Sequence, residues 1–251
     1  MEDIVKKNLK YIIYTLMLIL TFNIALGAEK EIKLSIAGSL EPVIKEVIEE
    51  YKKDIQNKDI NFITNYGGSG SLRKQIENGS DTDIVFFADK ENFEILKEKK
   101  LISDEELSFK IYNSLILVGN KQIISISEIN KEKVAIGDPL TVPAGKYAMN
   151  YLKSEGYEDK LKENLVYGKE VRVVTNYFNL GEVDFAIIYK TELEKIKGNY
   201  YTLSLNTKNK IEYSSGILLG RDSENVKKFY KFFETDKAKD IFKKAGYILS
   251  N

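Results

Sequence analysis

The residues best placed to do chemistry follow a short apolar run. Val134-Ala135-Ile136 predicts a buried strand, and Gly137-Asp138-Pro139-Leu140-Thr141-Val142-Pro143-Ala144-Gly145-Lys146-Tyr147 follows it. Pro143 suits a first helical turn, because its missing N–H would have no partner there. The amides of residues 144–146 would then be free donors at the positive end of a helix dipole, which favours anions. An ordinary strand–turn–helix connection explains the same pattern.

Three other loops and one strand end offer similar donors. They are Ala37-Gly38-Ser39, Gly67-Gly68-Ser69-Gly70-Ser71, Lys169-Glu170-Val171 before a helix, and Tyr189. Helix capping, turn formation and core packing explain each one alone. Together they predict a site that binds an anion through hydroxyl and amide groups.

Several catalytic and nucleotide-binding sites are excluded by missing residues. The chain has no histidine and no cysteine, so Ser-His-Asp and Cys-His sites and disulfides cannot form. The segment 140–147 is not a P-loop, since Leu140 and Tyr147 stand where a glycine and a hydroxyl residue are required. Ser69 is not a nucleophile elbow, because Ser71 replaces the second glycine.

Three aspartates offer an alternative metal cluster. They are Asp81, Asp83 and Asp89. Asp83 opens a predicted strand and Asp89 follows it, so turn and capping roles explain them better than a metal ion does.

The run GDP-x-x-VPAG-x-YA at 137–148 resembles the corresponding loop of molybdate-binding proteins, the extracytoplasmic receptors of molybdate ABC importers. The resemblance extends from about Ile32 to the C-terminus. It implies that the oxyanion donors are Ser39, Ser69, Ala144, Val171 and Tyr189. Ser71 competes with Ser69, because the family's second loop often carries several hydroxyl residues; we favour Ser69. We expect the acidic neighbours Glu41 and Glu170 to point to solvent.

The elements that must position these residues alternate between strand and helix. We expect strands at 32–37, 60–64, 83–88, 114–119, 134–136, 184–189, 200–205 and 214–219, and helices at 40–53, 72–78, 91–99, 126–130, 151–161, 172–180, 226–234 and 238–244, with one more after Pro143. Ser39 is expected to be the N-cap of the first helix. The alternation predicts an α/β fold with mostly parallel sheets flanked by helices. The resemblance implies a two-lobed periplasmic-binding-protein fold of type II. Lobe one would hold 28–110 and 214–251, lobe two 111–213, and the ligand would lie in the cleft between them.

The N-terminus predicts export. Lys6, Lys7 and Lys10 precede an uncharged run from Tyr11 to Leu26, and Ala25-Leu26-Gly27 suits signal peptidase. We expect residues 1–27 to be a signal peptide cleaved before Ala28; a membrane anchor is the alternative, although the run is short for a span. A lipid-anchored receptor needs a cysteine at its cleavage site, so the composition favours a freely diffusing periplasmic protein.

Composition and resemblance together predict a receptor. The formal net charge is zero, so the chain has no excess of positive charge that would attract nucleic acid or anionic lipid. We expect a monomeric molybdate receptor without enzymatic activity or cofactor, which delivers its ligand to the permease of an ABC importer. We expect it to bind tungstate too, because tungstate has nearly the same size and charge as molybdate. The only metal expected is molybdenum within the bound anion. The expected order of affinity is molybdate and tungstate, then sulfate, then phosphate. Alternatives are a receptor for sulfate, phosphate or Fe(III), a secreted enzyme acting on an anionic substrate, and a structural or adhesive surface protein.

Overall fold

The computed structural model describes residues 31–105, 107–207 and 211–250. The expected signal peptide lies outside these residues. Within them, no helix is long and apolar enough to cross a membrane.

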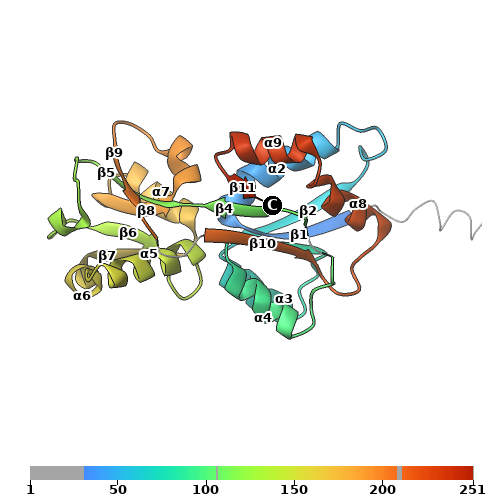
Figure 1. Ribbon diagram of the computed structural model, residues 1–251, viewed down its shortest axis with the longest axis horizontal. Coiled ribbons are helices and arrows are strands. Elements are labelled where there is room, and N and C mark those ends of the chain that lie inside the picture. Colours follow the sequence, from blue (N-terminus) through green and yellow to red (C-terminus); the bar gives the residue numbers. More distant parts are fainter. Residues whose placement is uncertain (1–30, 106, 208–210, 251) are drawn as a thin grey trace, which may run out of the picture.

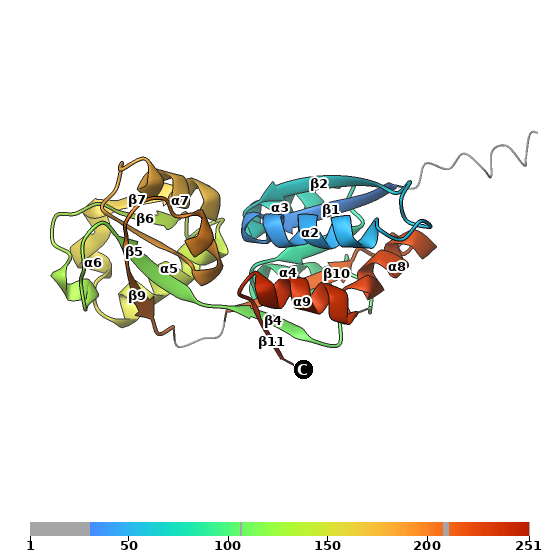
Figure 2. The same cartoon turned by 90° about the horizontal axis from the view of Figure 1, so that it is seen from above.

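Two β-sheets, each flanked by helices, lie side by side along the long axis of the molecule (Figures 1 and 2). The first has the strand order β11-β4-β10-β3-β1-β2. Its strands are β1 (Glu31–Ala37), β2 (Asn61–Gly67), β3 (Ile84–Phe87), β4 (Lys110–Asn113), β10 (Ile211–Ile217) and β11 (Ile248–Ser250). The second has the order β7-β6-β8-β5-β9. Its strands are β5 (Leu115–Gly119), β6 (Val134–Gly137), β7 (Leu165–Gly168), β8 (Phe185–Tyr189) and β9 (Tyr201–Leu205).

Helices cover both faces of each sheet (Figure 1). Around the first sheet these are α2 (Glu41–Tyr51), α3 (Ser69–Glu77), α4 (Lys90–Glu98), α8 (Glu224–Phe232) and α9 (Asp236–Lys244). Around the second they are α5 (Pro143–Ser154), α6 (Glu158–Leu161) and α7 (Val171–Asn179). Short 3₁₀ helices complete the chain: η1 (Gly38–Leu40), η2 (Ile126–Glu128), η3 (Lys162–Asn164) and η4 (Lys190–Lys195).

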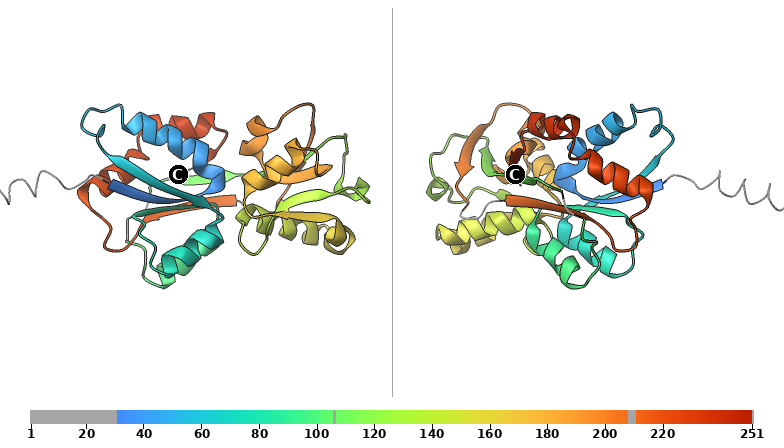
Figure 3. Two further views of the ribbon diagram at one scale, coloured as in Figure 1. Left: turned by 180° about the vertical axis from the view of Figure 1, so that it is seen from behind. Right: turned by 45° about the vertical axis from the view of Figure 1, so that its right-hand side comes forward.

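The two-lobed α/β architecture confirms the expected fold class, although the sheets are mixed. β1 pairs in parallel with β2 and β3, and β6 with β7 and β8. The strands β5 and β10 run antiparallel to their neighbours. The chain passes from the first sheet to the second between β4 and β5 (Figure 3). It leaves the second sheet after β9, and β10 belongs to the first sheet again. The lobe limits expected from the sequence stay a prediction.

Burial explains why β3 occupies the centre of the first sheet. Ile84 and Phe86 pack into the main hydrophobic core, while Val85 and Phe87 pack with α3 and α4 on the opposite face. Because successive side chains of a strand point to opposite faces, a strand that is apolar throughout must be covered on both.

Some element boundaries differ from those expected. The helix expected at 151–161 is divided: α5 continues to Ser154 and α6 begins at Glu158. The strands β4, β7 and β11 were not predicted. β10 begins at Ile211 rather than Ser214, which brings Tyr213 into the sheet.

Candidate oxyanion site

The strand register brings the predicted loops together. Ala37 at the end of β1 pairs with Gly67 at the end of β2, so the loops that follow these strands are neighbours. Gly137 at the end of β6 pairs in the same way with Gly168 of β7. Carboxyl ends of parallel strands are the usual place for ligand sites in α/β sheets.

All five predicted donors line one small pocket between the two sheets. The pocket has a volume of about 210 Å³ and is lined by Ala37, Gly38, Ser39, Gly67, Gly68, Ser69, Ala88, Val142, Pro143, Ala144, Glu170, Val171 and Tyr189. Ser71 is not among these residues. The space that these residues enclose is small, so the pocket favours a compact ligand. It contains no lysine or arginine in its lining, which suits binding through neutral donors.

Tyr189 provides a buried phenol with no partner. It ends β8, is fully buried, and its Oη has no hydrogen-bond partner among the described residues. Burial raises the pKa of the phenol well above its usual value, with smaller contributions from Tyr213 and Tyr147. The group therefore keeps its proton at neutral pH. An unpaired buried donor is costly, and a bound anion would satisfy it.

Ser39 receives its orientation from β10 rather than acting as a helix cap. The N-cap of α2 is Leu40, so the expected capping role of Ser39 is wrong. The Ser39 Oγ lies 3.2 Å from Tyr213 Oη, and the Asn113 Nδ2 donates to the same phenol oxygen at 3.0 Å. Since the amide can only donate, the phenol proton is available for Ser39 Oγ. The Ser39 proton is then left for a ligand.

Ser69 is the first residue of α3 and is fully buried. Its Oγ accepts a hydrogen bond from the Ala88 amide at 2.9 Å. The neighbouring Asp89 interacts with the Ser69 hydroxyl, but its pKa is raised because burial outweighs these hydrogen bonds. Asp89 also caps α4 by accepting from the Asn92 amide at 2.6 Å, which confirms its predicted capping role.

Ala144 and Val171 present helix-start amides. Ala144 is the second residue of α5, and Val171 is the first residue of α7. The first amides of an α-helix have no partner within the helix and carry its positive dipole end. Gly145 allows α5 to start against β6: a Cβ at this position would lie 1.9 Å from the Gly137 carbonyl oxygen.

The expectation that Glu41 and Glu170 point to solvent is wrong. Glu170 lines the pocket, and both carboxylates bind Arg172. Arg172 Nη1 donates to Glu41 Oε2, and Nη2 donates to Glu170 Oε2 at 3.0 Å. The two glutamate side chains are only 14% and 16% exposed. Glu41 begins α2 beside the first sheet, and Arg172 lies on α7 beside the second. The ion pair between them therefore connects the two lobes at the edge of the pocket.

Other contacts close the boundary between the sheets. The Gly70 amide donates to the Thr141 carbonyl at 3.2 Å, and Lys146 pairs with Glu91. A Cβ at Gly68 would lie 2.5 Å from the Thr141 carbonyl oxygen. The absence of a side chain at Gly68 thus permits the close approach of these two loops.

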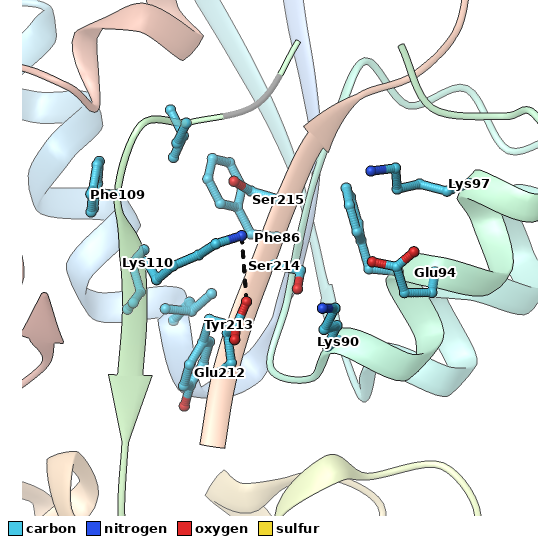
Figure 4. Close-up of a pocket in the computed structure, with 14 residues that line it drawn as sticks. Phe86, Lys90, Glu94, Lys97, Phe109, Lys110, Glu212, Tyr213, Ser214 and Ser215 are labelled. Carbon is cyan, nitrogen blue, oxygen red and sulfur yellow. Dashed lines mark ion pairs between the residues drawn. The ribbon is translucent and has the colours of Figure 1, made fainter. Parts of the chain in front are cut away.

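A larger cavity of about 800 Å³ lies apart from the predicted donors. It is formed by α4, β4 and β10, and Figure 4 shows lysines and glutamates on both sides of it. Lys110 pairs with Glu212 at 3.5 Å. Its lining of mixed charge does not favour a small dianion. Tyr213 separates the two spaces, since it lines this cavity while its hydroxyl contacts Ser39.

Within the described ranges, no group of three or more acidic side chains is placed to hold a metal ion. The alternative aspartate cluster is therefore not formed. Asp83 instead accepts a hydrogen bond from the Lys33 amide at 2.8 Å.

Sequence reasoning missed Tyr213, Asn113, Asp89 and Arg172 as neighbours of the donors. Arg172 directly follows the predicted donor Val171 and is the one charged residue of α7. This isolated charge beside a predicted donor could have indicated that Arg172 lies near the site. Tyr213 and Asn113 are distant in sequence and carry no local motif.

The chain matches bacterial extracellular solute-binding proteins over residues 32–248. It is 34% identical to the Bacillus subtilis ABC transporter substrate-binding lipoprotein YvgL, with 88% of each chain covered; that name specifies no substrate. It is 27% identical to the Escherichia coli molybdate-binding protein ModA, covering 90% of this chain and 91% of the relative. The periplasmic molybdate-binding protein of Azotobacter vinelandii has the same fold, with a TM-score of 0.77, 21% identity, and coverage of 88% of this chain and 100% of that one. The chain belongs to the bacterial extracellular solute-binding protein family.

Proposed function

We propose that this protein is an extracytoplasmic receptor for molybdate and tungstate that delivers the anion to the permease of an ABC importer. The observation that carries the proposal is the unpaired Tyr189 phenol in a compact pocket that also contains Ser39, Ser69, Ala144 and Val171. These groups offer hydroxyl and amide donors without a lysine or arginine. The relatives named for molybdate support the choice of anion.

The binding mechanism rests on fixed donors and closure of the two lobes. Hydrogen bonds to a charged partner contribute ~1.5–3 kcal/mol each, so a few of them offset the costs of binding. Closure of the loops around Gly68 and Thr141 would exclude water and give the permease a distinct surface. No covalent chemistry is required, and we propose no enzymatic activity and no cofactor.

Anion selectivity follows from size and protonation. Hydrogen phosphate needs an acceptor for its proton, whereas molybdate and tungstate are unprotonated dianions at neutral pH. Sulfate is also unprotonated but smaller, so fixed donors would lie too far from its oxygens. We therefore propose the order molybdate and tungstate, sulfate, phosphate, with Glu170 held by Arg172 rather than accepting a proton from the ligand.

The proposed location is the periplasm, reached through a signal peptide cleaved before Ala28. The sequence contains no cysteine that could carry a lipid anchor. N-terminal sequencing of the exported protein checks this. A membrane-bound product that still begins at Met1 would contradict it.

Calorimetry with ligand-free protein tests the function. Molybdate or tungstate at a hundredfold excess over Kd should stabilise the protein by ~2.7 kcal/mol, a rise in Tm of about 5–10 °C for a chain of this size. Ser69→Ala should weaken binding about ten- to a hundredfold, while the matched change Ser71→Ala should have an effect of less than about twofold. An absence of heat and of thermal shift with both anions would leave the receptor proposal without support.

A further inference from the structure

Glu170 is an acidic residue in the lining of the pocket proposed for the anion. It is the N-cap residue of α7, directly before Val171, whose amide is a proposed ligand donor. An N-cap side chain normally accepts hydrogen bonds from the first amides of its helix. The Glu170 side chain makes no such bond.

Arg172 holds the Glu170 carboxylate in a different place. Its Nη2 donates to Glu170 Oε2 at 3.0 Å, while its Nη1 donates to Glu41. The held carboxylate lies over Gly38, where a Cβ would come within 3.1 Å of Oε2. The guanidinium therefore fixes a carboxylate beside the pocket without letting it reach the start of α7.

The charges around Glu170 favour its movement once Arg172 is removed. Burial raises the pKa of Glu170, and Lys169 opposes this. Glu41, from α2, is a second carboxylate on the same guanidinium, and its other oxygen is bound by Lys45 at 2.7 Å. When the guanidinium is absent, Lys45 reduces but does not remove the repulsion between the two carboxylates. The positive end of α7 and Lys169 then remain to stabilise the carboxylate. Tyr189, which lines the same pocket, keeps its proton and is a further donor.

We propose that Arg172 is a positioning residue that keeps Glu170 from acting as an internal competitor for the anion. This inference rests on the proposed function, because it treats the Val171 amide as a ligand donor. Arg172 need not contact the ligand. Its effect on affinity passes through the location of the Glu170 carboxylate.

Four variants separate this role from a direct or clamping role. Relative to wild type, Arg172→Gln should weaken molybdate binding on the order of ten- to thirtyfold, the size expected for a charge at a partly buried helix start. Glu170→Gln should bind at least as tightly as wild type, and the double variant should return to within about threefold of Glu170→Gln. Glu41→Gln removes the contact across the boundary but leaves the Arg172–Glu170 pair, so its affinity should change by less than about threefold.

Two results would overturn the inference. A double variant as weak as Arg172→Gln would mean that Arg172 acts on the anion or on closure directly. Weakening by Glu41→Gln equal to that of Arg172→Gln would identify the cluster as an interlobe clamp.

Nuclear magnetic resonance of the ligand-free protein gives a readout that does not depend on the ligand's identity. In Arg172→Gln, the Val171 amide proton should shift downfield as Glu170 ionises, and by more than in wild type. The additional Glu170→Gln change should abolish this shift. If the wild-type protein binds neither molybdate nor tungstate, the proposed function fails, but this titration still shows where the Glu170 carboxylate lies. A Val171 signal that does not change in Arg172→Gln would refute the inference.

Discussion

The phenol oxygen of Tyr213 lies 3.2 Å from the hydroxyl oxygen of Ser39, which joins β10 to the first loop of the candidate site. Tyr213 is buried, and burial raises the pKa of its phenol, so the group remains a donor. Asn113 donates to the phenol oxygen, and we infer that the phenol in turn donates to the Ser39 hydroxyl oxygen. With the protons in this order, the Ser39 hydroxyl has its own proton to donate to the proposed ligand.

Tyr213→Phe should weaken anion binding less than Ser39→Ala does. The phenylalanine removes an orienting neutral hydrogen bond of ~0.5–1.5 kcal/mol, which corresponds to roughly two- to tenfold in Kd. Ser39→Ala removes a donor to the charge itself and should cost about ten- to a hundredfold. Titration calorimetry with molybdate compares the two. Equal losses would show that Tyr213 does more than orient Ser39.

Tyr189→Phe should have opposite effects on folding and on binding. Its hydroxyl is buried without a partner among the described residues, so its removal relieves an unsatisfied group worth ~1–3 kcal/mol in the ligand-free protein. The same hydroxyl is a proposed ligand donor, and its loss should weaken molybdate binding about ten- to a hundredfold. Urea unfolding without ligand and calorimetry with ligand measure the two effects. A variant that is both less stable and unchanged in affinity would mean that the phenol serves the fold.

The sequence was sufficient to predict the elements whose pattern is local. The apolar run at Val134 and the first-turn proline at Pro143 predicted β6 and the start of α5, and both are present. The short strand β7 could not be predicted, since Leu165–Gly168 is half-exposed and depends on pairing with β6. β11 likewise depends on β4, from which it is separated by most of the chain.

Site residues could be predicted where a loop has a recognisable local sequence pattern. They could not be predicted where a contact between residues distant in sequence sets the position of a side chain. The residue patterns indicated the loops and a strand end, the resemblance to molybdate-binding proteins named five donors in them, and these five residues line one pocket. The solvent-facing expectation for Glu170 failed because Arg172 holds its carboxylate, and the same guanidinium also binds Glu41 of the other lobe. Sequence spacing does not reveal a contact between residues 131 positions apart.

Gly68→Ala should impair closure of the two lobes. The added methyl carbon would lie 2.5 Å from the Thr141 carbonyl oxygen, a backbone atom that cannot move independently. We expect at least about tenfold weaker molybdate binding and a smaller ligand-induced decrease in radius of gyration by X-ray scattering. Gly67→Ala is the matched control, because its methyl would meet only the Leu72 side chain at 3.5 Å. Equal compaction of Gly68→Ala and wild type would show that closure does not require this contact.

Asp89→Asn should make the stability of the protein depend less on pH. Burial raises the pKa of Asp89 above that of an exposed aspartate, with Glu91 adding to the shift, while Asn92 and Ser69 oppose it. A carboxyl whose folded-state pKa is raised contributes its full stability below the unfolded pKa near ~4, and this contribution is lost as pH rises through the folded pKa. Asparagine can keep the helix cap without titrating. The difference in Tm between variant and wild type should therefore become more positive from pH 4 to pH 7.5, as measured by calorimetry. The control is Glu91→Gln, an exposed change on the same helix, whose difference in Tm from wild type should vary less with pH. If the difference in Tm for Asp89→Asn is constant or falls as pH rises, the ionised Asp89 carboxylate is stabilised in the folded protein and not penalised.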